Sequence, residues 1–415
     1  MKDKDLQWLD NLKIRAGWGQ VGNDGVNEND FVLKIADDIY FSSYVLGDPQ
    51  TNVKGATILT YVNEDGKWET NEQWDAGIDF SFWNGKLSGS VDYFLRDTKD
   101  ALLYVPAPAH AGSQFPMVQN VGVIRNQGVE VVLNHENKVG KFHYNIGGNF
   151  SWIKNELKSL NGGNPRYEDR VTINMGYPLR AFWGYIYEGV YTSDEEALAH
   201  LYSYSADEIG VHAGDARYRD LNGDGRIDDS DKTMIGNPFP AFTYGLNLGA
   251  DFYGVDIQIF FQGVAKMDVY NALRHSTEGA GDEMTLSKSM SNVWIGYTDL
   301  VREALLAKGI NWMELENRSA DALPNPVGSP SNNETSSRFI EDASYFRLKN
   351  LQVGYTIPKK YTEKAHIQRA RVYVSGSNLL TFTKYTGFDP EVGSGVDYGN
   401  YPQSRTWTFG LNLNF

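Results

Sequence analysis

The chain has no cysteine among its 415 residues, which excludes disulfide scaffolds, thiol catalysis and thiolate metal sites. Long apolar runs are missing as well. None approaches the roughly 18 residues that a membrane helix needs. Positive charge is scarce, since 38 Lys and Arg face 53 Asp and Glu for a net charge of −15. A chain this acidic is poorly suited to coat a phosphate backbone, so nucleic acid is not expected as a partner.

Motifs for catalysis are also missing. The sequence contains no G-x-S-x-G, H-E-x-x-H or P-loop pattern, and its seven His are scattered. A glycosidase pair could be hidden among the acids, because its two carboxylates need only be close in space, but nothing in the sequence selects one. Gly17–Gly22 has the G-x-G-x-x-G spacing of dinucleotide sites, yet it leads into Asn23-Asp24-Gly25 rather than into a helix. We therefore do not expect an enzyme.

Glycine and aromatic residues are abundant: 42 Gly, 10 Trp, 25 Tyr and 20 Phe. In long runs, apolar residues take every second position, with polar residues or glycine between them. Since side chains alternate between the two faces of a strand, each run predicts a strand with one apolar and one polar face. Such strands are typical of antiparallel sheets, because a buried parallel strand is apolar on both faces. The runs are Trp74–Phe82, Leu87–Leu95, Phe142–Trp152, Phe242–Phe252, Val255–Phe261, Leu351–Ile357 and Val372–Val374.

The connections between these runs are either short or very long. Trp83–Lys86 contains the Asn-Gly pair typical of hairpins. By contrast, no comparable run occurs in residues 20–55, 154–239, 267–339 or 383–403. Structureless loops of this length count against a compact soluble domain, whereas tight turns at one end and long loops at the other are typical of outer-membrane β-barrels. A secreted β-sandwich or propeller is the alternative.

The chain ends on a run in which apolar residues continue to the last position. An apolar strand at a free sheet edge invites aggregation unless it is paired into a closed sheet. The pattern resembles the signal that the bacterial outer-membrane assembly machinery reads on its substrates, although an ordinary core strand could also end this way. The residues of the predicted assembly signal are Trp407, Phe409, Leu411, Leu413 and Phe415.

Residues 220–231 have the spacing of a calcium-binding loop. Oxygen ligands at positions 1, 3, 5, 7, 9 and 12 encircle a hard cation, and Gly225 at position 6 permits the sharp turn. Position 12 is an Asp, as in dockerin-type loops, and Ile227 at position 8 would anchor the loop. An acidic surface turn that binds nothing is the alternative. The predicted ligands of a structural Ca²⁺ are Asp220, Asn222, Asp224, Arg226 through its backbone carbonyl, Asp228 and Asp231.

Several motifs, in order along the chain, resemble those of SusC/RagA-type TonB-dependent outer-membrane receptors. They are Trp68-Glu69-Thr70 with Gly77-Ile78-Asp79-Phe80, Asn126-Gln127-Gly128, Gly236-Asn237-Pro238, Tyr345–Asn350, Asn378–Thr383 and Phe388-Asp389-Pro390-Glu391. The resemblance implies a 22-stranded antiparallel transmembrane β-barrel, of which residues 1–415 would form a C-terminal portion of about 10–12 strands. Residues 157–239 and 267–340 would be long extracellular loop regions, the first containing the calcium-type loop. Residues 1–6 show no secretory signal, and no plug segment is recognised.

The resemblance also implies a function in the outer membrane of a Gram-negative bacterium. It implies import of oligosaccharides, or of peptides in some branches, with a SusD-like surface lipoprotein as partner. The TonB complex would act through an N-terminal part that this chain lacks, so the fragment is not expected to transport alone. A secreted soluble β-rich protein that binds or degrades glycans is the alternative function.

Overall fold

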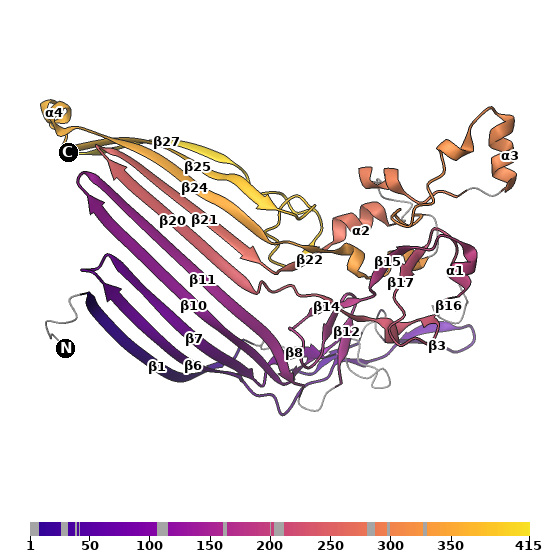
Figure 1. Ribbon diagram of the computed structural model, residues 1–415. Coiled ribbons are helices and arrows are strands. Elements are labelled where there is room, and N and C mark those ends of the chain that lie inside the picture. Colours follow the sequence, from indigo (N-terminus) through magenta and orange to yellow (C-terminus); the bar gives the residue numbers. More distant parts are fainter. Residues whose placement is uncertain are drawn as a thin grey trace.

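The computed structural model describes residues 8–25, 32–37, 40, 42–105, 115–160, 164–199, 201–202, 211–279, 287–296, 299–326 and 330–415. Ten long strands follow one another in a single antiparallel sheet (Figure 1). This confirms the predicted antiparallel architecture and strand number. The strands are β1 (Leu9–Asn23), β6 (Glu69–Phe82), β7 (Leu87–Lys99), β10 (Val123–Val139), β11 (Phe142–Ser159), β20 (Phe242–Phe252), β21 (Val255–Ala265), β24 (Tyr345–Ile357), β25 (Arg369–Thr383) and β27 (Thr406–Asn414).

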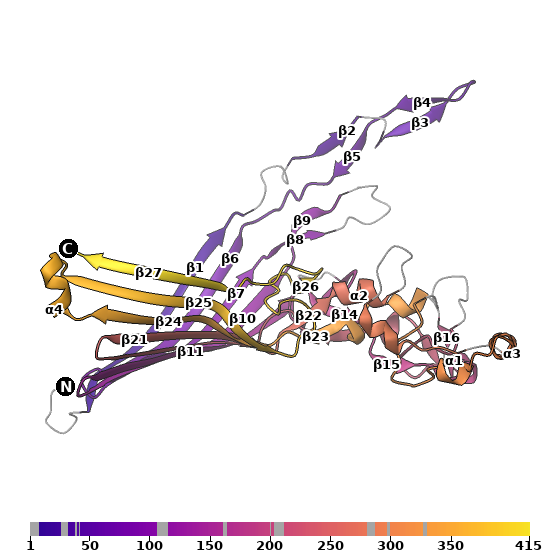
Figure 2. The ribbon, with the colours of Figure 1, turned by 90° about the horizontal axis from the view of Figure 1, so that it is seen from above.

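The sheet is strongly curved, with β11 and β21 at the base of the curve in Figure 2. Its two edges are β1 and β27, and across the described strands these edges do not pair with each other. The sheet is thus an open segment of a barrel wall. No helix among the described residues is long and apolar enough to cross a membrane.

Tight turns join the strands at one end of the sheet. Between β20 and β21, Phe252 pairs with Val255, which leaves only Tyr253 and Gly254 in the turn. Their φ angles of 49° and 87° are the positive values that a two-residue hairpin of type I′ requires. The connection from β24 to β25 is longer and contains α4 (Lys359–Thr362) and η8 (Glu363–Ala365).

The long connections at the other end are folded rather than structureless. Between the long strands they run from 24 to 68, from 100 to 122, from 160 to 241, from 266 to 344 and from 384 to 405. The third and fourth of these ranges lie within four residues of the predicted loop regions. In chain order the elements are β2 (Lys34–Ala36), β3 (Ser43–Leu46), β4 (Thr51–Lys54), β5 (Thr57–Thr60), β8 (Leu102–Val105), β9 (Met117–Asn120), β12 (Arg166–Glu168), β13 (Val171–Ile173), β14 (Ala181–Gly184), β15 (Tyr187–Val190), α1 (Asp194–Leu198), β16 (Leu201–Tyr202), β17 (Ala216–Tyr218), β18 (Arg226–Ile227), η3 (Asp229–Asp231), β19 (Thr233–Gly236), β22 (Asp268–Asn271), α2 (Ala272–Glu278), η4 (Lys288–Asn292), α3 (Asp299–Ala307), η5 (Trp312–Glu314), η6 (Pro330–Asn333), η7 (Ser337–Phe339), β23 (Ile340–Asp342) and β26 (Val396–Asp397).

Most of the buried apolar residues lie in this folded loop region and at the ends of the strands that meet it. One buried cluster contains Tyr185, Tyr191 and Ile227, and another contains Phe182, Tyr270 and Phe339. On the long strands, by contrast, large apolar side chains are exposed, reaching 78% for Ile14 and 82% for Phe409. Exposed apolar strands of this kind need another apolar medium to cover them.

The long strands differ in length where they meet the loops. β10 and β11 have 17 and 18 residues, whereas β20 and β21 have 11 each. β11 therefore pairs with β20 only from Phe142 to Trp152. Beyond that point the N–H of Leu157 donates to the carbonyl of Tyr177 at 2.9 Å, and the N–H of Gly176 donates to the carbonyl of Leu157 at 2.9 Å.

Candidate functional site: two faces of the sheet and the folded loops

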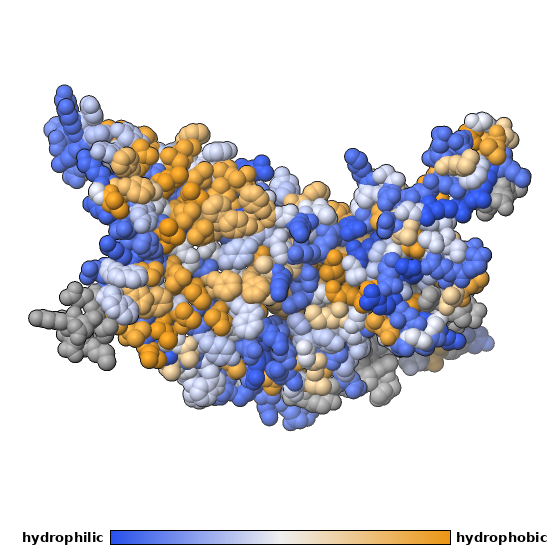
Figure 3. Space-filling model, viewed as in Figure 1, coloured by the Kyte–Doolittle hydropathy of each residue, from blue (hydrophilic) through white to orange (hydrophobic). Residues whose placement is uncertain are grey.

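The ten-stranded sheet has an apolar convex face and a polar concave face. Figure 3 shows apolar side chains gathered over the long strands on the convex side, whereas the folded loops are mostly hydrophilic. The strand register confirms the alternation read from the sequence. One row of facing residues on the apolar side is Ile14, Ile78, Val91, Val131, Phe150 and Tyr244.

Ion pairs cross the strands on the concave face. Arg15 of β1 lies 2.7 Å from carboxylate oxygens of both Asp79 and Asp92. The guanidinium passes above Gly77, where an added Cβ would lie 1.9 Å from Asp92 Oδ1. Glycine at this position thus leaves room for the Asp92 carboxylate beside the Arg15 guanidinium.

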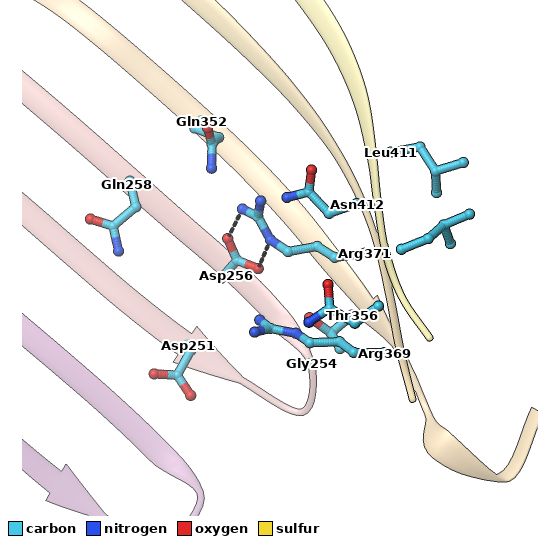
Figure 4. Close-up of a pocket in the computed structure, with 12 residues that line it drawn as sticks. Asp251, Gly254, Asp256, Gln258, Gln352, Thr356, Arg369, Arg371, Leu411 and Asn412 are labelled. Atoms are coloured by element: carbon cyan, nitrogen blue, oxygen red, sulfur yellow. Dashed lines mark hydrogen bonds and ion pairs between the residues drawn. The ribbon is translucent and has the colours of Figure 1, made fainter. Parts of the chain in front are cut away.

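A second ion pair lines an open groove of about 850 Å³ on the concave face, beside the tight turns. In Figure 4, Arg371 of β25 points toward Asp256 of β21, while Gln258, Gln352 and Asn412 surround the pair. The Arg371 Nε donates to Asp256 Oδ1 at 2.9 Å, and its second nitrogen bonds the other oxygen. The groove is thus lined mainly by polar side chains, and the two hydrogen bonds fix the relative position of the Arg371 and Asp256 charges.

A buried group of ion pairs joins β24 to the connection between β25 and β27, and we call Arg347 with its partners Asp389 and Glu391 the clamp. Arg347, whose side chain is 3% exposed, bonds Asp389 at 2.8 Å and Glu391 at 2.7 Å. Burial alone would raise the pKa of Asp389, but hydrogen bonds from Arg347 and from the backbone N–H groups of Gln403 and Glu391 outweigh it and hold the pKa below its ordinary value. The motif Phe388–Glu391, which carried part of the family resemblance, thus contains the partners of a buried arginine. Sequence reasoning missed this pairing.

Buried polar groups in the loop region are structural. Glu278 of α2 bonds Arg274 at 3.0 Å and Arg338 at 3.2 Å, and both members of the second pair are almost fully buried. Burial raises the pKa of Tyr191 and of Tyr270 to about 12, so both phenols stay protonated at neutral pH. The Glu278–Arg338 pair joins two segments of the loop region that are 60 residues apart in the sequence.

The predicted calcium loop forms a closed turn. Ile227 is fully buried and packs in one of the apolar clusters of the loop region. Asp220 accepts hydrogen bonds from the N–H groups of Gly223 and Gly225 at 2.6 and 2.9 Å. Asp231 is fully buried and accepts from Leu221 and Asp228 at 2.7 and 2.9 Å.

The remaining predicted ligands are also engaged in this turn. Asp224 accepts from the N–H of Arg226, Asn222 from the N–H of Asp224, and Asp228 from the N–H of Ser230. Within the described part of the chain, no three acidic or His side chains are grouped as a metal site. The turn is closed by hydrogen bonds, and calcium binding stays a prediction.

The predicted assembly signal lies at an edge of the sheet. In β27, Phe409 faces Val374 and Leu411 faces Val372, so the terminal alternation continues the apolar face. Trp407 and Leu413 share that face and are exposed, as is Phe415 beyond the end of the strand. Recognition of this strand by assembly machinery stays a prediction.

Comparison with known proteins places the chain in a family of outer-membrane receptors. Residues 5–252 match the family described as TonB dependent receptor-like, beta-barrel. This chain belongs to that family. TonB-dependent receptor P3 of Formosa agariphila is 32% identical, and the match covers 99% of this chain and 40% of that protein. SusC, a TonB-dependent receptor of Bacteroides thetaiotaomicron, is 27% identical over 99% of this chain and 38% of that protein.

The solved structures agree with the sequence comparison. The RagAB peptide transporter superposes with a TM-score of 0.77 at 25% identity, covering 99% of this chain and 42% of the transporter chain. The SusC/RagA assignment made from the motifs is confirmed, and with it the outer-membrane location. The relatives are receptors and transporters, so the expectation of a non-enzyme is confirmed by them. The chain spans about 40% of the length of the curated relatives.

Proposed function

We propose that this chain forms part of the wall and outer mouth of a TonB-dependent transporter that imports oligosaccharides or peptides. The observation that carries the proposal is the two-faced curved sheet, apolar outside and polar inside, in a chain similar to SusC and to a peptide transporter. A lipid-facing apolar wall and a polar lumen are the requirements of a transmembrane barrel that passes hydrophilic solutes. The secreted soluble alternative leaves the exposed apolar convex face unexplained.

Uptake in cells tests this function. A strain that lacks the gene should fail to take up at least one member of a panel of labelled oligosaccharides and peptides, and the restored gene should recover it. Dissipation of the proton gradient should abolish the same uptake, because TonB-dependent import is energised. Unchanged uptake of every member of the panel in the deletion strain would contradict the proposal.

We further propose a SusD-like surface lipoprotein as partner at the loop end of the sheet. The support is the kind of protein to which the chain is similar, together with folded loops at that end. Crosslinking in intact cells should join this protein to one lipoprotein in constant proportion. A crosslinking pattern without any lipoprotein would contradict this partner.

We also propose that residues 220–231 bind one Ca²⁺ with a dissociation constant of roughly 10⁻⁴–10⁻³ M, the range of extracellular modules. Asp224→Ala should abolish binding in calorimetry, since a ligand and a negative charge disappear together. Asp229→Ala is the matched control, because Asp229 is an exposed acid of the same loop that occupies no ligand position. If calorimetry detects no heat of binding when millimolar Ca²⁺ is added to the unaltered protein, the proposed site is refuted.

A further inference from the structure

Seven charged side chains lie on the convex face, next to its apolar surface. Cross-strand register places Trp74, Leu95, Gln127 and Lys154 in one row and Glu72, Asp97, Arg125 and Glu156 in the next row toward the loops. Since alternate residues share a face, these positions point to the same side as Phe150 and Trp152. We call this set the charged rim: Glu72, Asp97, Lys99, Arg125, Lys154, Glu156 and Lys158.

Tryptophans mark the boundary between the apolar surface and the charged rim. The rings of Trp18 and Trp74 lie 6.0 Å apart. Both indole N–H groups donate to Glu72 Oε1, at 3.1 and 3.3 Å. Tryptophan rings with an apolar body and a polar edge gather where the hydrocarbon of a membrane meets its headgroups. The charged rim therefore lies at headgroup level.

Within the charged rim the carboxylates lie beneath the cations. The side chains of Glu72, Asp97 and Glu156 are 13–16% exposed. Arg125 donates to both oxygens of Asp97 at 2.7 Å and is 32% exposed. Lys154 is 53% exposed and Lys158 is 38% exposed. A group approaching from the membrane thus meets ammonium and guanidinium groups first.

The cations also outnumber the acids. Both Lys154 and Lys158 bond the single carboxylate of Glu156, each at 2.7 Å. Four cations stand over three carboxylates here, in a chain whose overall charge is −15. Each ammonium has three donors, so the bond to Glu156 leaves further donors that can face outward. The charged rim therefore carries a local excess of positive charge, and its carboxylates fix the positions of the Lys and Arg side chains.

We propose that the charged rim binds the phosphate groups of a phosphorylated glycolipid, the lipid that fills the outer leaflet of Gram-negative outer membranes. The loop end of the sheet faces this leaflet, because outer-membrane barrels keep their tight turns in the periplasm. Phosphate accepts charge-assisted hydrogen bonds from Lys and Arg, and the apolar surface below the rim would contact the acyl chains. The inference rests on the outer-membrane location and requires no particular transport substrate.

Lipid binding to protein extracted from outer membranes and stripped of lipid tests the proposal. The probe is bis-phosphorylated lipid A in detergent, detected by native mass spectrometry. Each basic side chain near an anionic lipid surface strengthens binding about fivefold. Lys154→Gln combined with Lys158→Gln should therefore weaken binding about thirtyfold. The matched control combines Lys359→Gln with Lys360→Gln in α4, at the opposite end of the sheet, and should bind like the unaltered protein.

The unaltered protein provides a second test that needs no variant. Lipid A without phosphates should bind far more weakly, and inorganic phosphate alone should not compete at equal concentration. Equal binding of the two lipids, or equal loss in both double variants, would overturn the proposal. Tight binding of inorganic phosphate alone would also overturn it, since the site would then serve a free anion. Lipid binding is measured without transport, so its outcome and that of the uptake experiment are independent.

Discussion

Arg347→Leu should destabilise the protein by about 3–5 kcal/mol, because the substitution leaves the buried carboxylate of Asp389 without its cation. Arg347 is almost fully buried and bonds both Asp389 and Glu391. Without the guanidinium, the segment between β25 and β27 should detach from β24. Hydrogen exchange in residues 384–405 and the free energy of unfolding in detergent would measure the effect.

Lys349→Gln is the matched control for this prediction. Lys349 bonds the same Glu391 at 2.6 Å, but its side chain is 21% exposed, so water can replace it. Its loss should cost about 1 kcal/mol or less. Equal destabilisation by the two substitutions would contradict the assignment of Arg347 as the clamp.

The ion pair between Arg347 and Asp389 should also make the stability of the protein decrease at acidic pH. Because the pKa of Asp389 is lowered in the folded protein, its contribution to stability is present above the ordinary pKa of an Asp and is lost as the pH falls through the lowered value. Exchange in residues 384–405 should therefore rise below about pH 4.

Leu248→Arg should destabilise the sheet by about 2–4 kcal/mol in a lipid bilayer, because the charge would face hydrocarbon. Leu248 lies between Ile146 and Ile259 on the convex face. Folding into lipid vesicles, followed by heat-dependent migration on gels, would measure the loss.

Asn247→Arg tests the same strand on its other face. Asn247 is exposed on the concave side, between Gly147 and Phe260, and should accept a charge with little loss of stability. If the two arginines disturb insertion equally, the two faces of the sheet are not used differently.

Alternation was sufficient to predict most of the long strands and their faces, because lipid on one side and polar groups on the other enforce a period of two. β10 is an exception, since no alternating run was recognised in Val123–Val139. Trp407–Phe415 and Phe242–Phe252 are examples in which each apolar position lies on the convex face. The fold of the long connections could not be predicted in this way. Their strands are two to four residues long and their contacts join distant segments, as when Tyr218 donates to the carbonyl of Ser331 at 2.7 Å.

The ion pairs could not be predicted from the sequence for a related reason. Arg347 and Asp389 are 42 residues apart, and only the pairing of β24 with β25 brings the segments together. The charged rim was visible as charges that interrupt the alternation, such as Lys154, Glu156 and Lys158 directly after Trp152. Because the apolar alternation stops at Trp152, the sequence alone places these charges in the connection that follows rather than on the strand.

Because β11 is longer than β20, part of β11 would have an unpaired edge if the loop region did not cover it. Above Trp152, β11 continues without its neighbour, so its backbone presents a free edge to which strands of other molecules could add. Segment 174–179 covers this edge, with backbone bonds between Leu157 and residues 176 and 177 and a bond from the N–H of Leu179 to Asn155 Oδ1 at 2.8 Å. The first part of the long connection thus protects the protein against aggregation, and a shortened loop that omitted it would expose a strand edge able to pair with other chains.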